Sequence, residues 1–417
     1  MTAATAGRRR GPTRPADARG GVRPARLFEP RPEPEAIDAS LDAGLDAGLL
    51  DEAISRCVAF CVEAARNTVR DACAPVDLYT GSSGLGLELL HHTARPGVAE
   101  AVDLLAHWTA RHSRGLPAGL YSGRTGVALF LQRAGILYHD DDPLPRDRPD
   151  GGSPGADLLA DAAGIGIGHL LLLAGSDDVD WQWHLAVAAE CHRILMNSIA
   201  TLTPTDAAEF DGAELGIAEP GTAAPAAGIA RGEAGIAFFL TEYTHATGDL
   251  GARAAARAIC DRLAARTPDV IARAMEPDAG RRDESWFREL TIIGRVLLRA
   301  ADRLGEPRYR ELARLCADTC VRIAPHMPRV GQCCGLAGVG DFLIDTAAAT
   351  GDESRWHEAG TVAHAILTRG GGTWSHPAFL DGEPTPARAN WSAGSSGVLA
   401  FLRRLRDRRG SRLATPL

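Results

Sequence analysis

Two adjacent cysteines, Cys333 and Cys334, are the residues of this sequence whose types are best suited to chemistry. A cysteine thiolate is a nucleophile and a metal ligand. Two cysteines alone make a poor zinc site, because catalytic zinc normally has three protein ligands. His376 or the pair Cys191 and His192 could complete such a site, although nothing in the sequence places them nearby. Cys333 and Cys334 lie on a Gly-rich turn rather than within an apolar helix, so a role in a site and a structural role both stay open.

The turn that carries these cysteines is one of seven in which small residues lead directly into an apolar run. Repetition at a period of a few tens of residues indicates one supersecondary unit stacked on copies of itself. The seven segments begin at Leu78, Leu120, Leu158, Gly228, Trp286, Gln332 and Asn390.

Each repeat is predicted to be a helical hairpin. Segments with charged and apolar residues at helical spacing, such as 98–112, 252–266 and 306–322, precede the turns and should face water on one side. The helices that begin in the turns are almost entirely apolar or small, as expected for helices covered on both sides. The glycines allow a tight entry and a close approach of neighbouring helices. Seven such hairpins predict an all-α fold, a double-layered α/α toroid whose open end, where the turns converge, is the natural place for a site.

The domain organisation follows from the same pattern. Residues 1–36 are rich in Arg, Pro and Gly without periodicity, and we expect a disordered extension there. The toroid should occupy residues 45–410 as one domain. Two stretches, 139–156 and 202–227, are predicted to be loops between repeats.

Composition excludes several classes of function. A net charge of −8 argues against electrostatic binding of nucleic acid. No stretch approaches the length of a membrane span, and the N-terminus has no apolar segment typical of a secretory signal. Nine cysteines in 417 residues do not make a disulfide scaffold, so we expect a reduced, cytoplasmic protein. Cysteines four residues apart should be small buried residues on one helix face: Cys57 with Cys61, and Cys316 with Cys320.

Two other kinds of site fit the turns less well. The glycines superficially match phosphate-binding loops, but no buried strand precedes them and no Lys follows. A glycosidase would need two carboxylates flanking a cleft, and the carboxylates near the turns are better explained as charges favoured at helix N-termini. They are Asp283, Glu284, Glu289 and Asp341.

The sequence resembles the lanthionine synthetase C-like family over residues 78–405. The resemblance rests on the seven turns in order, with a cysteine in the sixth, and on T-H-A-T-G-D at 244–249, echoed by T-A-A-A-T-G-D at 346–352. It rests further on the closing segment N-W-S-A-G-S-S-G-V-L-A-F-L. By this resemblance the reaction is addition of a peptide Cys thiol across dehydroalanine or dehydrobutyrine, which closes a thioether ring. The implied partner is a dehydrated precursor peptide, and separate kinase or lyase enzymes would make the dehydro residues.

The resemblance also implies a zinc site and a proton donor, from which this chain departs. In the family, a Cys after Trp in the fifth repeat and a Cys-His pair in the sixth bind zinc, and a His before Gly in the fourth is the acid–base candidate. Here Phe287 follows Trp, Cys334 stands in place of His beside the retained Cys333, and Arg231 replaces the acid–base His. Glu289 also replaces a turn glycine. We therefore expect no cofactor, with zinc on Cys333 and Cys334 as the alternative.

The favoured prediction is a zinc-independent, lanthionine-forming cyclase. Its candidate site residues are Cys333, Cys334 and Arg231, whose guanidinium could hold an enolate oxygen. The alternative is a catalytically silent homologue that binds the precursor peptide or scaffolds a modification complex.

Overall fold

The computed structural model describes residues 47–136, 138, 162–175, 181–200, 233–276, 285–333, 335–369 and 384–408. Within these ranges the regular structure is helical and contains no strand. None of the described helices combines the length and apolar character needed to cross a bilayer. The extension 1–36 and the predicted loops 139–156 and 202–227 lie outside the described residues.

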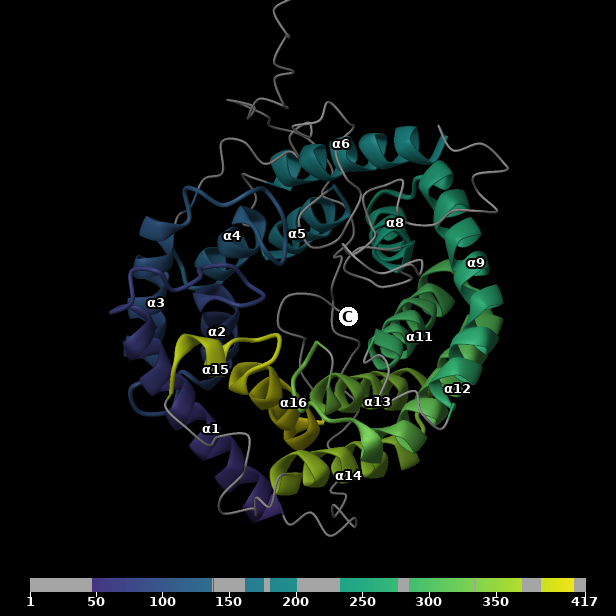
Figure 1. Ribbon diagram of the computed structural model, residues 1–417. Coiled ribbons are helices and arrows are strands. Elements are labelled where there is room, and N and C mark those ends of the chain that lie inside the picture. Colours follow the sequence, from purple (N-terminus) through teal and green to yellow (C-terminus); the bar gives the residue numbers. More distant parts are fainter. Residues whose placement is uncertain are drawn as a thin grey trace, which may run out of the picture.

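The helices form two concentric rings, as predicted (Figure 1). Consecutive inner helices contact one another, and α16 contacts α2, so the inner ring is closed. The inner helices are α2 (Ser82–Leu89), α4 (Arg124–Arg133), α5 (Ala162–Gly175), α8 (Glu233–Thr247), α11 (Ser285–Leu304), α13 (Leu336–Thr350) and α16 (Ser395–Asp407). The described outer helices are α1 (Ala47–Thr68), α3 (Val98–His112), α6 (Trp181–Ala200), α9 (Leu250–Ala274), α12 (Pro307–Ile323) and α14 (Ser354–Thr368). The short helix α15 (Pro386–Ala389) precedes the last turn, and two 3-10 turns occupy Leu90–His92 and Ala324–His326.

Sequence pattern decides which ring a helix joins. Every residue of α2 is buried, as are residues 162–173 of α5, because apolar or small side chains surround these helices. Outer helix α3 buries one stripe, which includes Val98, Val102 and Leu105, and exposes its charged side chains. The cysteine pairs in α1 and α12 are buried in the same core, which confirms their expected structural role.

Glycines within the inner helices receive aromatic rings from the next inner helix. A β-carbon at each of four glycines would lie 2.2 to 2.3 Å from a Phe ring, a separation no side chain can occupy. The inner helices therefore approach one another closely at these points. The four pairs are Gly86 with Phe130, Gly166 with Phe239, Gly294 with Phe342, and Gly340 with Phe401.

The T-G-D motif forms the turn from an inner helix to the next outer helix. Thr247 donates its hydroxyl to the backbone carbonyl four residues earlier and accepts from the backbone N–H of Asp249. Gly248 adopts a φ of +74°, which side chains rarely tolerate. The Asp249 carboxylate caps α9 by accepting from the backbone N–H of Ala252 at 2.8 Å. The second copy, at 350–352, repeats the glycine and hydroxyl contacts, so this motif is structural.

A buried ion pair joins the first and last inner helices. Glu88 of α2 is fully buried and accepts two hydrogen bonds from Arg403 of α16, at 2.8 and 3.0 Å. His92 lies 3.0 Å from the same carboxylate. Burial alone would raise the pKa of Glu88, but Arg403 and the hydrogen bond from His92 hold it below its ordinary value. The pair therefore places a fixed negative charge at the closure of the ring.

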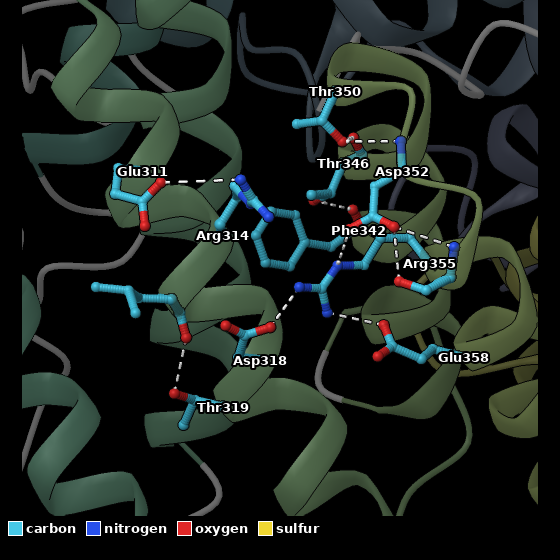
Figure 2. Close-up of polar contacts among 12 residues, drawn as sticks. Glu311, Arg314, Asp318, Thr319, Phe342, Thr346, Thr350, Asp352, Arg355 and Glu358 are labelled. Atoms are coloured by element: carbon cyan, nitrogen blue, oxygen red, sulfur yellow. Dashed lines mark hydrogen bonds and ion pairs between the residues drawn. The ribbon is translucent and has the colours of Figure 1, made fainter.

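Outer helices are also tied by charge. Figure 2 shows Arg355 of α14 reaching Asp318 of α12 on one side and Glu358 of its own helix on the other. The Arg355 side chain is only 6% exposed, and its distance to Glu358 is 2.8 Å. Asp352, which also belongs to the second T-G-D motif, lies 3.7 Å away. Three carboxylates thus surround one buried guanidinium between neighbouring outer helices.

A histidine pair lies between the two rings at α5 and α6. His169 is 3% exposed, and its Nδ1 lies 3.0 Å from Nδ1 of His184. Burial first, and the neighbouring His184 second, lower the pKa of His169 well below its ordinary value. The folded protein therefore keeps His169 neutral.

Arg403→Met should destabilise the protein by about 3–5 kcal/mol, because it leaves the Glu88 carboxylate buried without its guanidinium. Urea unfolding followed by circular dichroism measures the change. Arg406→Met on the same helix is the matched control, since Arg406 is half-exposed and its pair with Asp51 should contribute less than about 1 kcal/mol. Equal losses for both variants would contradict the assigned role of the buried pair.

Stability should fall as the pH drops below 6.5, the ordinary pKa of histidine. The unfolded chain binds a proton there that the folded His169 does not, so this site alone costs about 1.4 kcal/mol at pH 5.5. His169→Leu should flatten the pH dependence between pH 8 and 5.5, measured by urea unfolding. His107→Leu, at an exposed position, should leave it unchanged. A wild-type profile that matches that of His169→Leu would refute this assignment.

Candidate functional site

Four of the inner helices begin with the same backbone turn. The capping glycines Gly81, Gly123, Gly335 and Gly394 have φ between −145° and −104°, so none needs the left-handed region. Space is the reason for glycine: a β-carbon at each would lie 2.5 to 2.7 Å from the backbone carbonyl oxygen six residues earlier. Each turn therefore folds back tightly on itself. The end of the inner ring at which these turns lie and the inner helices begin is here termed the mouth.

Equivalent residues of neighbouring turns are joined through their backbones. Tyr121, Tyr79, Ser392 and Cys333 each lie two residues before a capping glycine, in the second, first, seventh and sixth turns. The N–H of Tyr79 donates to the carbonyl of Tyr121 at 2.9 Å, and that of Ser392 donates to Tyr79 at 3.0 Å. The N–H of Cys333 donates to Ser392 at 2.8 Å. This ladder fixes four side chains in one register around the mouth.

Cys333 and Tyr79 meet across the mouth. The Tyr79 hydroxyl donates a hydrogen bond to the Cys333 sulfur, with Oη and Sγ 2.6 Å apart, and both residues are half-buried. The Tyr79 ring packs edge-on against Tyr121, with centroids 6.1 Å apart, and Tyr121 stacks on Trp391 at 5.8 Å. We name Tyr79, Tyr121, Cys333 and Trp391 the turn cluster. It combines a thiol, a hydroxyl donor and an aromatic wall.

A buried charge network supports the sixth turn from behind. The side-chain amide of Gln332, next to Cys333, donates to the carboxylate of Asp341, which also accepts from Arg404 at 2.7 Å. Arg295 of α11 donates to the carbonyl of Gly338 at 3.1 Å. Burial lowers the pKa of Arg295 to about 10, although Asp341 opposes the shift. Guanidinium groups from two neighbouring inner helices therefore hold the start of α13.

This network corrects the interpretation of Asp341. It was expected to be a charge at a helix N-terminus, or else one carboxylate of a glycosidase pair. Instead Asp341 is 1% exposed in the second turn of α13 and engaged by Arg404. Glu289 is also buried and lies 3.8 Å from Arg266, while Asp283 and Glu284 lie outside the described residues. Both described carboxylates are buried beside arginine side chains.

The described residues do not fit the zinc site that the resemblance implies. No group of three His, Cys, Asp or Glu side chains that could hold a metal occurs among them. Cys191 is buried in α6, where burial first and Glu190 second raise the pKa of its thiol, and His192 stacks on Tyr243. We therefore derive no step through a metal.

The structure places only part of the predicted site. Cys333 lies at the mouth, as expected for a turn cysteine. Arg231, Cys334 and His376 lie outside the described residues. Tyr79 was missed. Aligning L-Y-T-G in the first turn with Q-C-C-G in the sixth puts Tyr79 at the position of Cys333, and that was the available signal.

Gly335→Ala should lower the free energy of unfolding by about 1–3 kcal/mol, because the added carbon meets the backbone carbonyl of Arg329 at 2.7 Å. Gly115→Ala is the control, since no atom lies within 4 Å of its added carbon, and it should change stability by less than about 0.5 kcal/mol. Thermal unfolding compares the two. A Gly335→Ala variant as stable as the control would contradict the close fold-back of the turn.

Comparisons with known proteins bear on the second half of the ring. No curated protein sequence matches the chain significantly. A solved structure described as nisin cyclase overlaps 84% of this chain and 98% of its own, with a TM-score of 0.47 and 13% sequence identity. This TM-score and this sequence identity are too low to support an inference about function. A sequence model of the family described as lanthionine synthetase C-like protein matches residues 218–408, which include α8 to α16 and Cys333. Over this part, a little under half of its length, the chain is similar to the lanthionine synthetase C-like family.

Proposed function

We propose that this protein is a zinc-independent cyclase of lanthipeptide biosynthesis. It would promote addition of a peptide Cys thiol to dehydroalanine or dehydrobutyrine, forming a thioether ring. The similarity of residues 218–408 to the lanthionine synthetase C-like family supports the reaction class. The observation that supports the zinc-independent form is the change of two implied ligands, since Phe287 stands in place of a Cys and Cys334 in place of a His. At the mouth, the Tyr79 hydroxyl donates a hydrogen bond to the retained Cys333 sulfur.

The reaction sets three chemical demands. The peptide thiol must lose its proton before sulfur bonds to the β-carbon of the dehydro residue. The displaced π electrons form an enolate, whose oxygen needs a positive charge or a hydrogen-bond donor. A proton must then reach the α-carbon, so that the product contains every atom of the reactants.

The proposed roles follow these demands. Cys333, half-buried at the mouth, would lie beside the reacting thiol, with Cys334 next to it in sequence. Arg231 would hold the enolate oxygen, because a guanidinium stays protonated and donates several hydrogen bonds. The substrate would be a precursor peptide dehydrated by separate enzymes, and the protein would act in the cytoplasm.

The test is ring closure of a dehydrated peptide that contains one Cys, in zinc-free buffer with a chelator. Loss of the free thiol is followed by maleimide labelling and mass spectrometry, against the spontaneous rate without protein. Cyclisation should exceed that rate, and Cys333→Ala should lower it at least tenfold, since the thiol at the mouth is removed. Cys73→Ala, at an exposed cysteine outside the turn cluster, is the control and should keep full activity.

Two results would overturn this proposal. Near-stoichiometric zinc in the purified protein, lost in Cys333→Ala and measured by elemental mass spectrometry, would make the reaction metal-dependent. Binding of the peptide without any acceleration would instead favour the alternative, a silent homologue that scaffolds a modification complex.

A further inference from the structure

The sixth turn, which carries Cys333, has polar side chains at two buried positions where the first, second and seventh turns have apolar or aromatic ones. Gln332 stands three residues before its capping glycine, and Asp341 stands six residues after it. Gln332 is 6% exposed and Asp341 is 1% exposed. In the other three turns the first position holds Leu78, Leu120 and Trp391, and the second holds Leu87, Leu129 and Ala400.

The backbone and the packing of the sixth turn match those of its neighbours. The N–H groups of Leu336 and Ala337 donate to carbonyls seven residues earlier, at 3.0 and 3.1 Å. Ser82 and Ser83 make the same two bonds in the first turn, at 3.0 and 3.3 Å. In three turns the side-chain β-carbon at the first position would lie 2.8 to 3.0 Å from one added to a glycine of the neighbouring inner helix. These contacts are Gln332 on Gly397, Leu78 on Gly126 and Trp391 on Gly84.

The polar groups of the sixth turn are tied to two other inner helices. The side-chain amide of Gln332 donates to the carboxylate of Asp341. Arg404 of α16 donates to Asp341 and to Asp345, at 2.7 Å in each case. Nε of Arg295, on α11, lies 3.5 Å from Oδ2 of Asp345. The residue next to Cys333 is therefore linked to α13, α16 and α11.

This network is a costly way to stabilise a turn. Charges lose their hydration on burial, and apolar side chains of similar volume often stabilise a fold as well or better. Two atoms of the network, Oε1 of Gln332 and Nε of Arg404, are buried without a hydrogen-bond partner in the part of the chain that the structure describes, which adds to the cost. The neighbouring turns form with apolar or aromatic residues at both positions. The position that the network fixes explains it better than added stability does.

Cys333 is the residue whose position is at stake. Its N–H donates to the carbonyl of Ser392 at 2.8 Å, and its sulfur accepts from the Tyr79 hydroxyl at 2.6 Å. These contacts come from the neighbouring turns, whereas Gln332 anchors the same segment to the inner helix that follows it. A displacement of about 1 Å at a reacting group can lower a rate about a hundredfold. An anchor one residue from the thiol therefore bears directly on the reaction.

We propose that Gln332 and Asp341 are positioning residues for the cyclisation, which hold the sixth turn so that Cys333 stays beside the reacting thiol. The proposal rests on the proposed function and adds to it two residues that touch neither the peptide nor the reacting atoms. Arg404 acts through Asp341, because it keeps that carboxylate in place for the Gln332 amide.

Gln332→Leu gives the sixth turn the residue found in the first and second turns. It should lower kcat for ring closure about tenfold and leave KM within about twofold, because the peptide contacts remain while the thiol loses its fixed position. Circular dichroism checks that the variant is folded under the assay conditions. Gln132→Leu is the matched control, since it removes a glutamine hydrogen bond to the Leu172 carbonyl between α4 and α5, and both constants should stay unchanged.

Hydrogen–deuterium exchange, resolved to single amides by mass spectrometry, tests the anchor without any substrate. In Gln332→Leu the amides of Leu336 and Ala337 should exchange at least about fivefold faster, because local opening of the turn becomes easier. The equivalent amides of the first turn, Ser82 and Ser83, should keep their rates. Unchanged exchange at the sixth turn would overturn the proposal.

A measurement on the unaltered protein guards against a variant that fails to fold. After correction for intrinsic rates, the amides of Leu336 and Ala337 should exchange more slowly than those of Ser82 and Ser83. All four make the same backbone bonds, and only the sixth turn has the polar anchor. Equal or faster exchange at the sixth turn would refute the anchoring.

Ring-closure kinetics separate this inference from the proposed function. If both stand, faster exchange at the sixth turn accompanies the lower kcat of Gln332→Leu. Faster exchange in a protein that closes no rings would refute the cyclase and leave the anchoring of the turn intact. An unaltered kcat in Gln332→Leu, or a rise in KM as large as the fall in kcat, would retain the cyclase and refute the positioning role.

Discussion

Closure of the inner ring between α2 and α16 is the constraint on which the rest of this structure depends. Inner helices such as α2 and α5 are apolar on nearly every side and are covered only when both neighbours are present. The first and last helices are neighbours only if the chain returns to its start. The buried pair Glu88–Arg403 stands at that junction, between residues 315 positions apart in sequence. The ion pair adds a charged contact at this junction, while apolar burial supplies most of the stabilisation.

The site is a product of the same closure. Tyr79 belongs to the first repeat and Cys333 to the sixth, 254 residues later. The backbone ladder runs from the second turn through the first and seventh to the sixth, and it crosses the junction between α2 and α16. A ring left open there would separate the hydroxyl from the sulfur. The stability of the fold and the Tyr79–Cys333 contact at the mouth therefore depend on the same ring closure.

Local pattern was enough to predict the architecture. Small-residue turns followed by apolar runs marked the inner helices, and helical spacing marked outer segments such as 98–112, which is α3. The tight entry predicted for the capping glycines is confirmed. Their φ values are extended, so they are required by close approach to a carbonyl and not by a left-handed backbone. The role of Asp341 could not be read from sequence, because its partner Arg404 lies on the next inner helix.

The four turns of the ladder keep one backbone register although the residue two places before the glycine is Tyr, Tyr, Cys or Ser. The side chain at this position can therefore differ from turn to turn, because the backbone hydrogen bonds do not depend on it. A substitution there changes the functional group at the mouth without disturbing the inner helices that follow. Under the proposed function, catalytic character in such a ring can be lost, moved or rebuilt by single codon changes. The fold can therefore persist after an activity is lost, and a thiol can replace a hydroxyl at this position during evolution while the fold stays constant.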